Sequence, residues 1–148
     1  MGVIVGFDYG KARIGIAVSS ESKTLAFAHG VYKRVGGKED GKACAAFLKE
    51  NNAEAFVIGL PLNMDGSEGD SAKGARILAK EIAKHSGCGV HFIDERLTTV
   101  EAYEKLKKTG KKQVDSRVCI DACAAEIILQ EYLDANYKIS DAEESEEE

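Results

Sequence analysis

The sequence predicts an α/β fold in which a mixed five-stranded sheet carries helices on both faces. Three short apolar runs come first, one continuous at residues 3–7 and two with a period of two at 14–19 and 25–31, and they predict three meandering antiparallel strands. From residue 40 onward, helical periodicity alternates with buried apolar runs. This order predicts two more strands, which arrive through helical crossovers and run parallel to the first strand.

The antiparallel half begins with Val3–Phe7, a β-branched run that ends at Asp8 and is apolar enough to be buried on both faces. The turn that follows is too short for a crossover helix, so Ile14–Ser19 forms a hairpin with the first strand. The third strand continues the period of two from Leu25 and is ended by Gly36 and the glycine after it.

The parallel half contains two helices, each followed by a buried strand. We expect the first helix to begin near Asp40, which could cap it, and to lead into the strand Ala55–Leu60. The second helix places apolar residues of the range 75–82 on one face, and it leads into the strand Val90–Ile93.

Two further helices complete the predicted domain. Thr98 has the spacing of a capping box with Glu101, which predicts a helix as far as Gly110. A last helix starts near Asp115 or Ser116, runs to about residue 136 and is apolar around most of its circumference. Asp121 is the exception among its apolar neighbours.

Charge is distributed unevenly along the 148 residues, a length that suits one domain. The formal net charge is −5, with 25 acids and 20 bases, which by itself argues against a nucleic-acid partner. Six of the acids lie in the last eight residues, so the remainder of the chain holds 19 acids against 20 bases. We therefore predict a near-neutral domain at 1–138 and an acidic, disordered tail at 139–148.

The cysteines and the hydropathy pattern indicate where the protein works. Four cysteines, at 44, 88, 119 and 123, form no Cys-x-x-Cys pair and are expected to be structural thiols in a reducing compartment. No apolar run reaches the ~18 residues of a membrane span, and the first residues lack the pattern of a signal peptide. We expect a cytoplasmic protein with no membrane partner.

Acidic residues follow two of the predicted parallel strands. Asp8 ends the first strand, and Asp94 with Glu95 ends the last. The carboxyl ends of parallel strands share one edge of a sheet, and a helix packed on that face could bring Asp121 to them. Clustered carboxylates favour Mg²⁺ or Mn²⁺, and two such ions ~4 Å apart can promote phosphodiester cleavage.

Each acid also has a structural explanation. Asp8 could be a turn residue that bonds its own backbone, and Asp121 could pair with Arg117 one helical turn away. Asp94 and Glu95 point to opposite sides if the strand continues, so one of them at most is expected to line the site.

Four segments resemble the motifs of the YqgF/RuvX family, which has the RNase H fold. They are DYGKARIGIA at 8–17, GLPLNMDG at 59–66, DERLTT at 94–99 and IDACAA at 120–125, within a match from Val3 to about Asp134. The resemblance implies metal-dependent cleavage of structured nucleic acid: maturation of the 5′ end of pre-16S rRNA, resolution of Holliday junctions, or both. It also implies that Asp8, Glu95 and Asp121 are the catalytic, metal-binding carboxylates, with Asp94 as a further candidate ligand.

The sequence departs from the resolvase pattern at two positions. The resolvase has an acid near the end of the fourth strand, where this chain has Gly59 and Leu60. It also has paired acids on the last helix, whereas Ala124 stands three residues after Asp121 here. An acid from the fifth strand would have to replace the missing one.

Basic and amide side chains near these motifs are candidate substrate contacts. Arg13 could hold a phosphate or form a salt bridge with Asp94 or Glu95, and Asn63 with Asp65 could contact substrate or shape their loop. The remaining candidates are Lys11, Arg96, Lys107, Lys108, Lys111 and Lys112. The lysine-rich stretch could be a solvated helix end, but its place before the last helix favours contact with a phosphate backbone. It holds no aromatic residue, so a duplex or junction suits it better than a single strand.

Two other functions fit part of the sequence. A non-catalytic module that binds nucleic acid or a ribosome-associated protein would retain the acids for structure. A nucleotide-binding ATPase related to actin and sugar kinases would need a second domain, for which the chain has no length, and the GxxxxGK[ST] loop is missing. The sequence leaves open DNA or RNA as substrate, and a monomer or a homodimer as the assembly.

Overall fold

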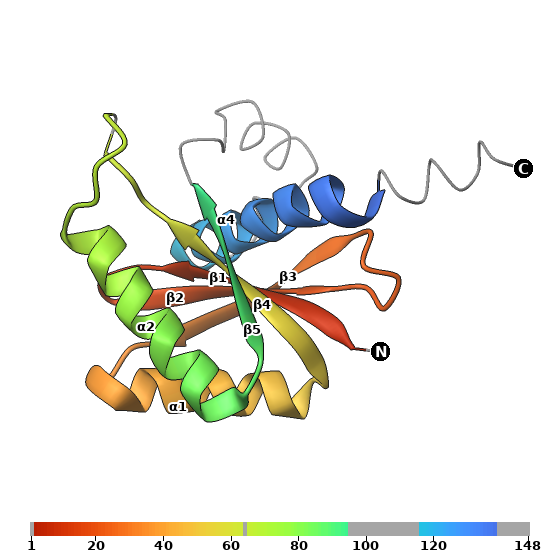
Figure 1. Cartoon of the computed structure of the whole chain (residues 1–148), viewed down its shortest axis with the longest axis horizontal. Helices are drawn as coiled ribbons and strands as arrows, with labels where there is room; N and C mark the ends of the chain where they lie inside the picture. Colours follow the sequence, from red (N-terminus) through yellow and green to blue (C-terminus); the bar gives the residue numbers. More distant parts are fainter. Residues whose placement is uncertain (1, 64, 95–115, 139–148) are drawn as a thin grey trace, which may run out of the picture.

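The structure is a computed structural model that describes residues 2–63, 65–94 and 116–138 (Figure 1). Its sheet has five strands in the order β3-β2-β1-β4-β5. Their bounds are Val3–Tyr9 for β1, Arg13–Ser19 for β2, Ala26–Lys33 for β3, Ala53–Leu60 for β4 and Gly89–Asp94 for β5. β2 pairs antiparallel with both β1 and β3, whereas β4 pairs parallel with both β1 and β5. The predicted mixed sheet is confirmed.

Helices lie on both faces of this sheet. Helices α1 (Gly37–Glu50) and α2 (Asp70–Ser86) cover one face, and α4 (Ser116–Leu133) covers the other (Figure 1). The last turn continues as a short π-helix, Asp134–Lys138. The predicted helix from Thr98 to Gly110 and the acidic tail lie outside the described residues. Within the described ranges, no helix is long and apolar enough to cross a membrane.

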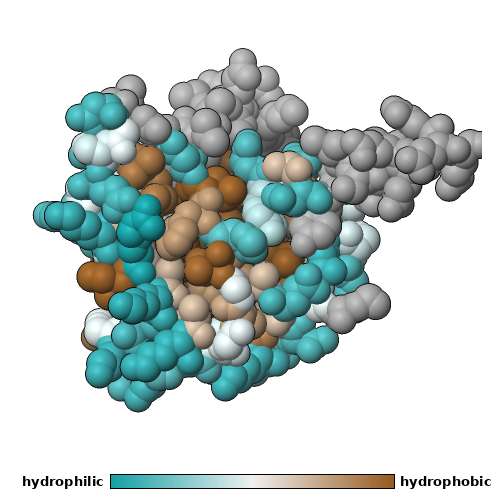
Figure 2. Space-filling view, viewed as in Figure 1, coloured by the Kyte–Doolittle hydropathy of each residue, from teal (hydrophilic) through white to brown (hydrophobic). Residues whose placement is uncertain are grey.

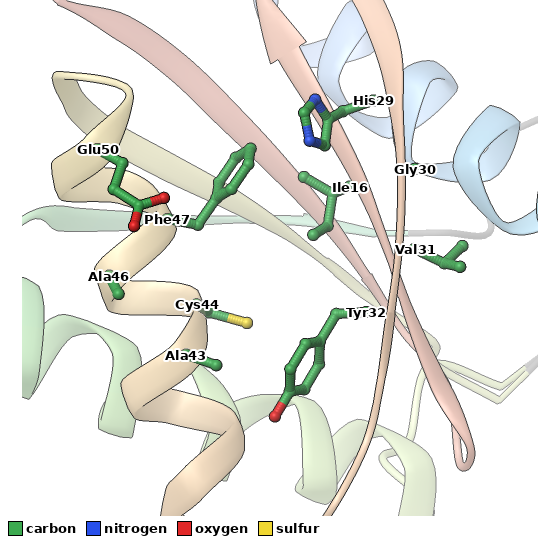
Figure 3. Close-up of a pocket in the computed structure, with 10 residues that line it drawn as sticks. All are labelled: Ile16, His29, Gly30, Val31, Tyr32, Ala43, Cys44, Ala46, Phe47 and Glu50. Carbon is green, nitrogen blue, oxygen red and sulfur yellow. The ribbon is translucent and has the colours of Figure 1, made fainter.

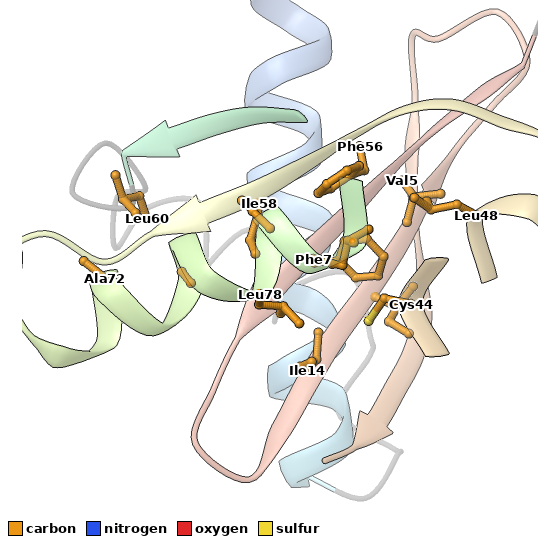
Figure 4. Packing of buried hydrophobic residues seen from close by; sticks show 14 residues of the cluster. Val5, Phe7, Ile14, Cys44, Leu48, Phe56, Ile58, Leu60, Ala72 and Leu78 are labelled. Carbon is orange, nitrogen blue, oxygen red and sulfur yellow. The ribbon is translucent and has the colours of Figure 1, made fainter. Parts of the chain in front are cut away.

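The face under α1 and α2 is packed with large side chains. Phe7 of β1 and Phe56 of β4 are fully buried, with an edge-to-face contact and ring centroids 5.9 Å apart. Leu48 of α1 and Leu78 of α2 close over them (Figure 4). α2 ends at Gly87, which adopts a left-handed conformation with φ of 76°. The apolar face predicted for this helix is confirmed.

The start of α1 differs from the prediction. We expected Asp40 to cap the helix, but the helix begins three residues earlier at Gly37, with Gly36 at the N-cap and φ of 103°. Asp40 lies inside the helix, and its carboxylate accepts hydrogen bonds from the backbone N–H groups of Val35 and Gly36 at 3.0 and 3.1 Å. An acid one turn inside the helix thus satisfies donors that precede it, which the sequence alone did not indicate.

Candidate functional site

The carboxyl ends of β1, β4 and β5 meet at one edge of the sheet. Phe7 of β1 is level with Ile58 of β4, and Leu60 of β4 is level with Asp94 of β5. Asp8 and Asp94 therefore lie near the same edge, separated by the width of β4. The predicted gathering of parallel strand ends is confirmed.

The alternation of side chains places Asp8 on the face covered by α4. Phe7 belongs to the cluster under α1 and α2, and Ile4 belongs to the cluster under α4. Because successive residues of a strand point to opposite faces, Asp8 shares the α4 face with Ile4. Its cross-strand partner in the hairpin is Gly15.

The same argument places Asp94 on the opposite face. Ile93 packs into the cluster under α4, and the ring of His91 lies 4.9 Å from that of Tyr132 on α4. Phe92 instead faces α2, where the Arg76 guanidinium covers its ring at 4.9 Å. By alternation, Asp94 falls on the α2 face with Phe92. The next position, Glu95, lies outside the described residues.

A glycine allows α4 to pack directly against β1. A Cβ atom at Gly6 would lie 2.8 Å from the Cβ of Leu129 and 3.3 Å from the carbonyl oxygen of Ala125, so no side chain fits there. Asp121 precedes Ala125 by one helical turn. The amino end of α4 lies on the same side of the molecule as the carboxyl end of β1 (Figure 1). The backbone of α4 therefore approaches the edge that carries Asp8.

The proposed metal ligands are only partly described. The side chains of Glu95 and Asp121 lie outside the described part of the chain, which leaves Asp8 from the predicted set. Among the described residues, no three His, Cys, Asp or Glu side chains form a group that could hold a metal ion. The metal site remains a prediction.

The turn after Asp8 is held by an arginine that the sequence analysis did not single out. The Nη1 group of Arg34 donates to the hydroxyl of Tyr9 at 3.0 Å and to the carbonyl oxygens of Gly10 and Lys11 at 3.0 and 3.2 Å. Its Nε donates to Asp40 at 2.8 Å. No motif marks Arg34, because its partners come from β1, the following turn and α1.

Asp40 is the anion of this network and is 1% exposed. Burial by itself raises the pKa of Asp40, but hydrogen bonds from Arg34 and from the N–H groups of Val35 and Gly36 outweigh it and hold the pKa below its usual value. The pKa of Tyr32 is raised by burial and by its hydrogen bond to Asp40. The carboxylate is therefore ionised at neutral pH and fixes Arg34 against the turn.

The loop after β4 is shaped by its own polar residues. Asn63 donates from Nδ2 to the hydroxyl of Ser67 at 3.0 Å, and Asp65 accepts from the N–H and hydroxyl of Ser67 at 2.9 and 2.6 Å. Glu68 at its end accepts from Arg76 of α2 at 2.7 Å. These bonds favour the loop-shaping role that we weighed for Asn63 and Asp65.

The structure describes two of the basic residues that we predicted to contact substrate. Lys11 is exposed in the turn between β1 and β2. Arg13 begins β2 and alternates with Ile14 of the α1/α2 cluster, so it lies on the α4 face with Asp8. Arg96 and the lysines at 107, 108, 111 and 112 lie outside the described residues.

The three cysteines that the structure describes form no disulfide with one another. Cys44 and Cys123 are buried and Cys88 is half-buried. Burial, with a smaller contribution from the charge of Asp40, raises the pKa of Cys44 to about 12, so its thiolate is scarce at neutral pH. These placements agree with structural thiols.

An apolar groove lies away from Asp8, between α1 and β3 (Figure 3). Its volume is about 550 Å³, and the ring of His29 contacts that of Phe47 with centroids 4.8 Å apart. It opens on the α1 face, whereas Asp8 lies on the α4 face, so the groove is not part of the candidate site.

This sheet order, with an acid at the end of the central strand and a helix packed over it, defines an RNase H-like domain. Known structures share the fold. Thermus thermophilus RuvC superposes with a TM-score of 0.59 at 18% identity, covering 90% of this chain and 95% of that one. The Fowlpox virus resolvase, solved with Holliday junction DNA, gives 0.56 at 12% identity, covering 90% and 97%.

Sequence comparison identifies the family within this class. The family model described as "RuvX: Holliday junction resolvase" matches residues 2–135, and the chain belongs to this family. A relative from Anaeromyxobacter sp. (strain Fw109-5) is 41% identical over 133 residues, covering 90% of this chain and 97% of the relative. One from Klebsiella pneumoniae is 35% identical over 136 residues, covering 92% and 99%. Both carry the name "Putative pre-16S rRNA nuclease". The resemblance found in the four motifs is confirmed.

Proposed function

We propose that this protein is a nuclease that requires Mg²⁺ or Mn²⁺ and hydrolyses phosphodiester bonds in structured nucleic acid. Its substrate classes would be those named for its relatives, pre-16S rRNA and Holliday junction DNA. The observation that carries the proposal is the place of Asp8. It ends the central strand of an RNase H-like sheet, on the face against which α4 packs.

The proposed metal ligands are Asp8, Glu95 and Asp121. Carboxylate oxygens are the donors that Mg²⁺ and Mn²⁺ prefer, so this set fits such ions. Asp94 falls on the α2 face, and continued alternation would turn Glu95 toward Asp8. The proposal therefore assigns the strand β5 ligand to Glu95 and removes Asp94 from the set.

When bound, the ions would activate water and stabilise the leaving oxygen. The protein's own residues would position the substrate around them. Arg13 lies on the same face as Asp8 and suits a phosphate next to the scissile bond. Arg34 would be a positioning residue that does not touch the substrate, since it fixes the turn that follows Asp8. The lysines at 107, 108, 111 and 112 would contact the nucleic-acid backbone farther away.

The test compares two neighbouring acids. Wild type, Asp8→Asn, Glu95→Gln and Asp94→Asn are incubated with a four-way DNA junction and with 5′-extended pre-16S rRNA, each with Mg²⁺, Mn²⁺ or EDTA. We expect a metal-dependent product that Asp8→Asn and Glu95→Gln reduce by more than about 100-fold, since even partners of metal ligands contribute about 10–100-fold. Asp94→Asn is the matched control and should cleave within about threefold of wild type.

Three outcomes would contradict this proposal in different ways. Binding without cleavage in any metal would favour the non-catalytic module. Loss of cleavage in Asp94→Asn but not in Glu95→Gln would overturn the ligand assignment. Cleavage that persists in EDTA would overturn the metal requirement.

The boundary of the nuclease domain is part of the same proposal. We assign residues 1–138 to the domain and 139–148 to an acidic tail, because the family match ends at residue 135 and the acids concentrate beyond Ser140. Deleting 139–148 should leave the melting temperature unchanged. A large drop would mean that the tail is part of the folded domain.

A further inference from the structure

The outer face of α2 carries a row of lysines. Lys73, Lys80 and Lys84 are exposed, and at 3.6 residues per turn they fall within an arc of about 40°. The residues that α2 buries against the sheet are centred on the opposite side of the helix; they are Ala72, Ala75, Leu78, Ala79 and Ile82. We call Lys73, Lys80 and Lys84 the α2 lysine row.

Two other basic side chains of α2 lie next to acidic side chains. Arg76 pairs with Glu68 at 2.6 Å, and His85 lies 3.4 Å from Glu81. Among the residues that the structure describes, none forms an ion pair with a member of the lysine row. The outermost surface of α2 is therefore cationic around one exposed apolar residue, Ile77. Figure 2 shows mostly hydrophilic residues on this side of the molecule, with some hydrophobic ones among them.

The row begins near the carboxyl edge of the sheet, on the α2 face and not on the α4 face that holds Asp8. The hydroxyl end of Tyr9 lies so close to Gly74 that no side chain could be added at that glycine. Lys73 precedes Gly74, and Tyr9 follows Asp8 but points to the other face of β1, so a phosphate backbone that leaves Asp8 would pass around the sheet edge to reach Lys73. From there the row extends about 16 Å along the helix to Lys84, away from the edge that carries Asp8.

The charge of the two layers decides from which side a polyanion would approach. Among the described side chains of α4, at residues 122–133, the exposed charged one is Glu131, and no base is present. In contrast, α2 has four Lys or Arg residues against two acids. A phosphate backbone that continues past Asp8 would meet repulsion along α4 and attraction along α2.

We propose that the α2 lysine row binds the phosphate backbone of a double-stranded arm that leaves the cleavage site. The inference rests on the proposed nuclease function and extends its substrate contacts to a second surface. Successive phosphates of one strand rise by ~3.4 Å, so a span of about 16 Å faces about five of them. Each lysine could therefore reach its own phosphate, which gives affinity without sequence preference.

α1 provides a matched control surface. It also has three exposed lysines, Lys38, Lys42 and Lys49, but exposed Glu39 and Glu50 lie among them and the helix carries as many acids as bases. The two sets share residue type, number and layer. They differ in the balance of neighbouring charge and in distance from Tyr9.

The experiment measures binding separately from cleavage. Fluorescence anisotropy in EDTA is recorded for wild type, for K73Q/K80Q/K84Q and for K38Q/K42Q/K49Q, with DNA and RNA duplex arms of about 20 base pairs joined to a junction. Affinity is measured from 50 to 200 mM salt. Circular dichroism confirms that both triple variants retain the melting temperature of wild type.

We expect the α2 triple variant to bind at least about 10-fold more weakly at 0.1 M salt. The slope of log affinity against log salt should fall by up to about 2.7 for DNA, because three phosphate contacts contribute about 0.9 each. The α1 triple variant should keep the slope of wild type. An unchanged slope in the α2 variant, or an equal fall in both variants, would overturn the inference.

The outcome is distinguishable from failure of the proposed function. If wild type cleaves in a metal-dependent way while the α2 variant binds and cleaves as wild type does, the lysine row has no such role and the nuclease proposal stands. If wild type neither binds nor cleaves any of these substrates, both proposals fall. If the α2 triple variant loses less affinity for RNA arms than for DNA arms, the lysine row fits a DNA duplex better than an RNA duplex.

Discussion

The two faces of the sheet are built in different ways. Under α1 and α2, large side chains such as Phe7, Phe56 and Leu48 fill the space between sheet and helices. Under α4, Gly6 leaves no space for a side chain, so the helix backbone lies near β1, although Ile4 and Val57 are also buried on this face. Both faces bury apolar area, and the second also fixes the distance between a helix and the strand that carries Asp8. The second face thus places a helix backbone close to the strand that carries the proposed ligand Asp8.

Removing a large side chain from the α1/α2 face should produce the largest loss of stability. Phe56→Ala leaves a cavity between β4 and its neighbours, so we expect the free energy of unfolding to fall by about 3–5 kcal/mol. Urea denaturation measures the loss. Cleavage by the fraction that remains folded should stay within about threefold of wild type. A far larger loss of cleavage would show that this face also sets the geometry of the site.

A small addition to the α4 face should affect activity more than stability. Gly6→Ala places a Cβ atom 2.8 Å from that of Leu129, so α4 must shift. Overpacking of this kind costs about 1–3 kcal/mol, and a displacement near 1 Å can cost about 100-fold in rate. We expect cleavage to fall by about 10–100-fold at a temperature where the variant is fully folded.

Gly30→Ala is the control for that substitution. Gly30 also lies in a strand of the sheet, but nothing lies within 4 Å of an added Cβ atom. Its effect on stability should lie within about 1 kcal/mol, with cleavage unchanged. Equal effects at Gly6 and Gly30 would argue against close approach of α4 as the cause.

The stability that the Asp40 carboxylate contributes, through Arg34 and the turn after Asp8, should depend on pH. Asn at position 40 keeps one acceptor oxygen and loses the charge, so Asp40→Asn should cost about 1 kcal/mol at pH 7. Because the folded-state pKa of Asp40 is lowered, the carboxylate contributes stability above the unfolded-state pKa near 4 and loses it as pH falls through the folded-state value. The difference between wild type and variant should therefore be constant from pH 7 to 5 and shrink below pH 4. A difference that persists at pH 2 would assign it to packing.

The smallest expected effect concerns Cys44. Burial and a pKa of about 12 keep its thiol protonated and covered. In a variant that retains only this cysteine, labelling by a thiol reagent at pH 8 should follow global unfolding. Fast labelling in the native state would mean that α1 opens locally.

The sequence predicted the features that follow from period and order. The strand sequence, the parallel ends and the buried face of α2 all come from local patterns, and the structure confirms them. It could not predict the role of Gly6, because that glycine matters only through Leu129, more than a hundred residues away. Arg34 was missed for the same reason. The sequence pattern around Asp40 predicted that it caps α1, whereas Asp40 lies inside the helix and binds residues that precede it.

The residues of the candidate site could be placed only in part from the sequence. Asp8 could be placed at a strand end from the sequence, and the register then added the face on which it lies. The contacts of His91, Phe92 and Ile93 were needed to place Asp94 on the α2 face, and the assignment of the β5 ligand to Glu95 is a proposal built on that placement. Sequence alternation alone states that the two acids diverge without saying which one turns toward α4.

The contact of Gly6 with α4 also bears on the order of synthesis and folding. β1, β2 and β3 lie within the first 33 residues and can pair soon after they are made. The helix that completes the α4 face extends to Leu133, so that face stays open until nearly the whole domain has left the ribosome. A chain built in this way can fold early as a hairpin sheet, yet its proposed nuclease site cannot assemble on a partly made protein.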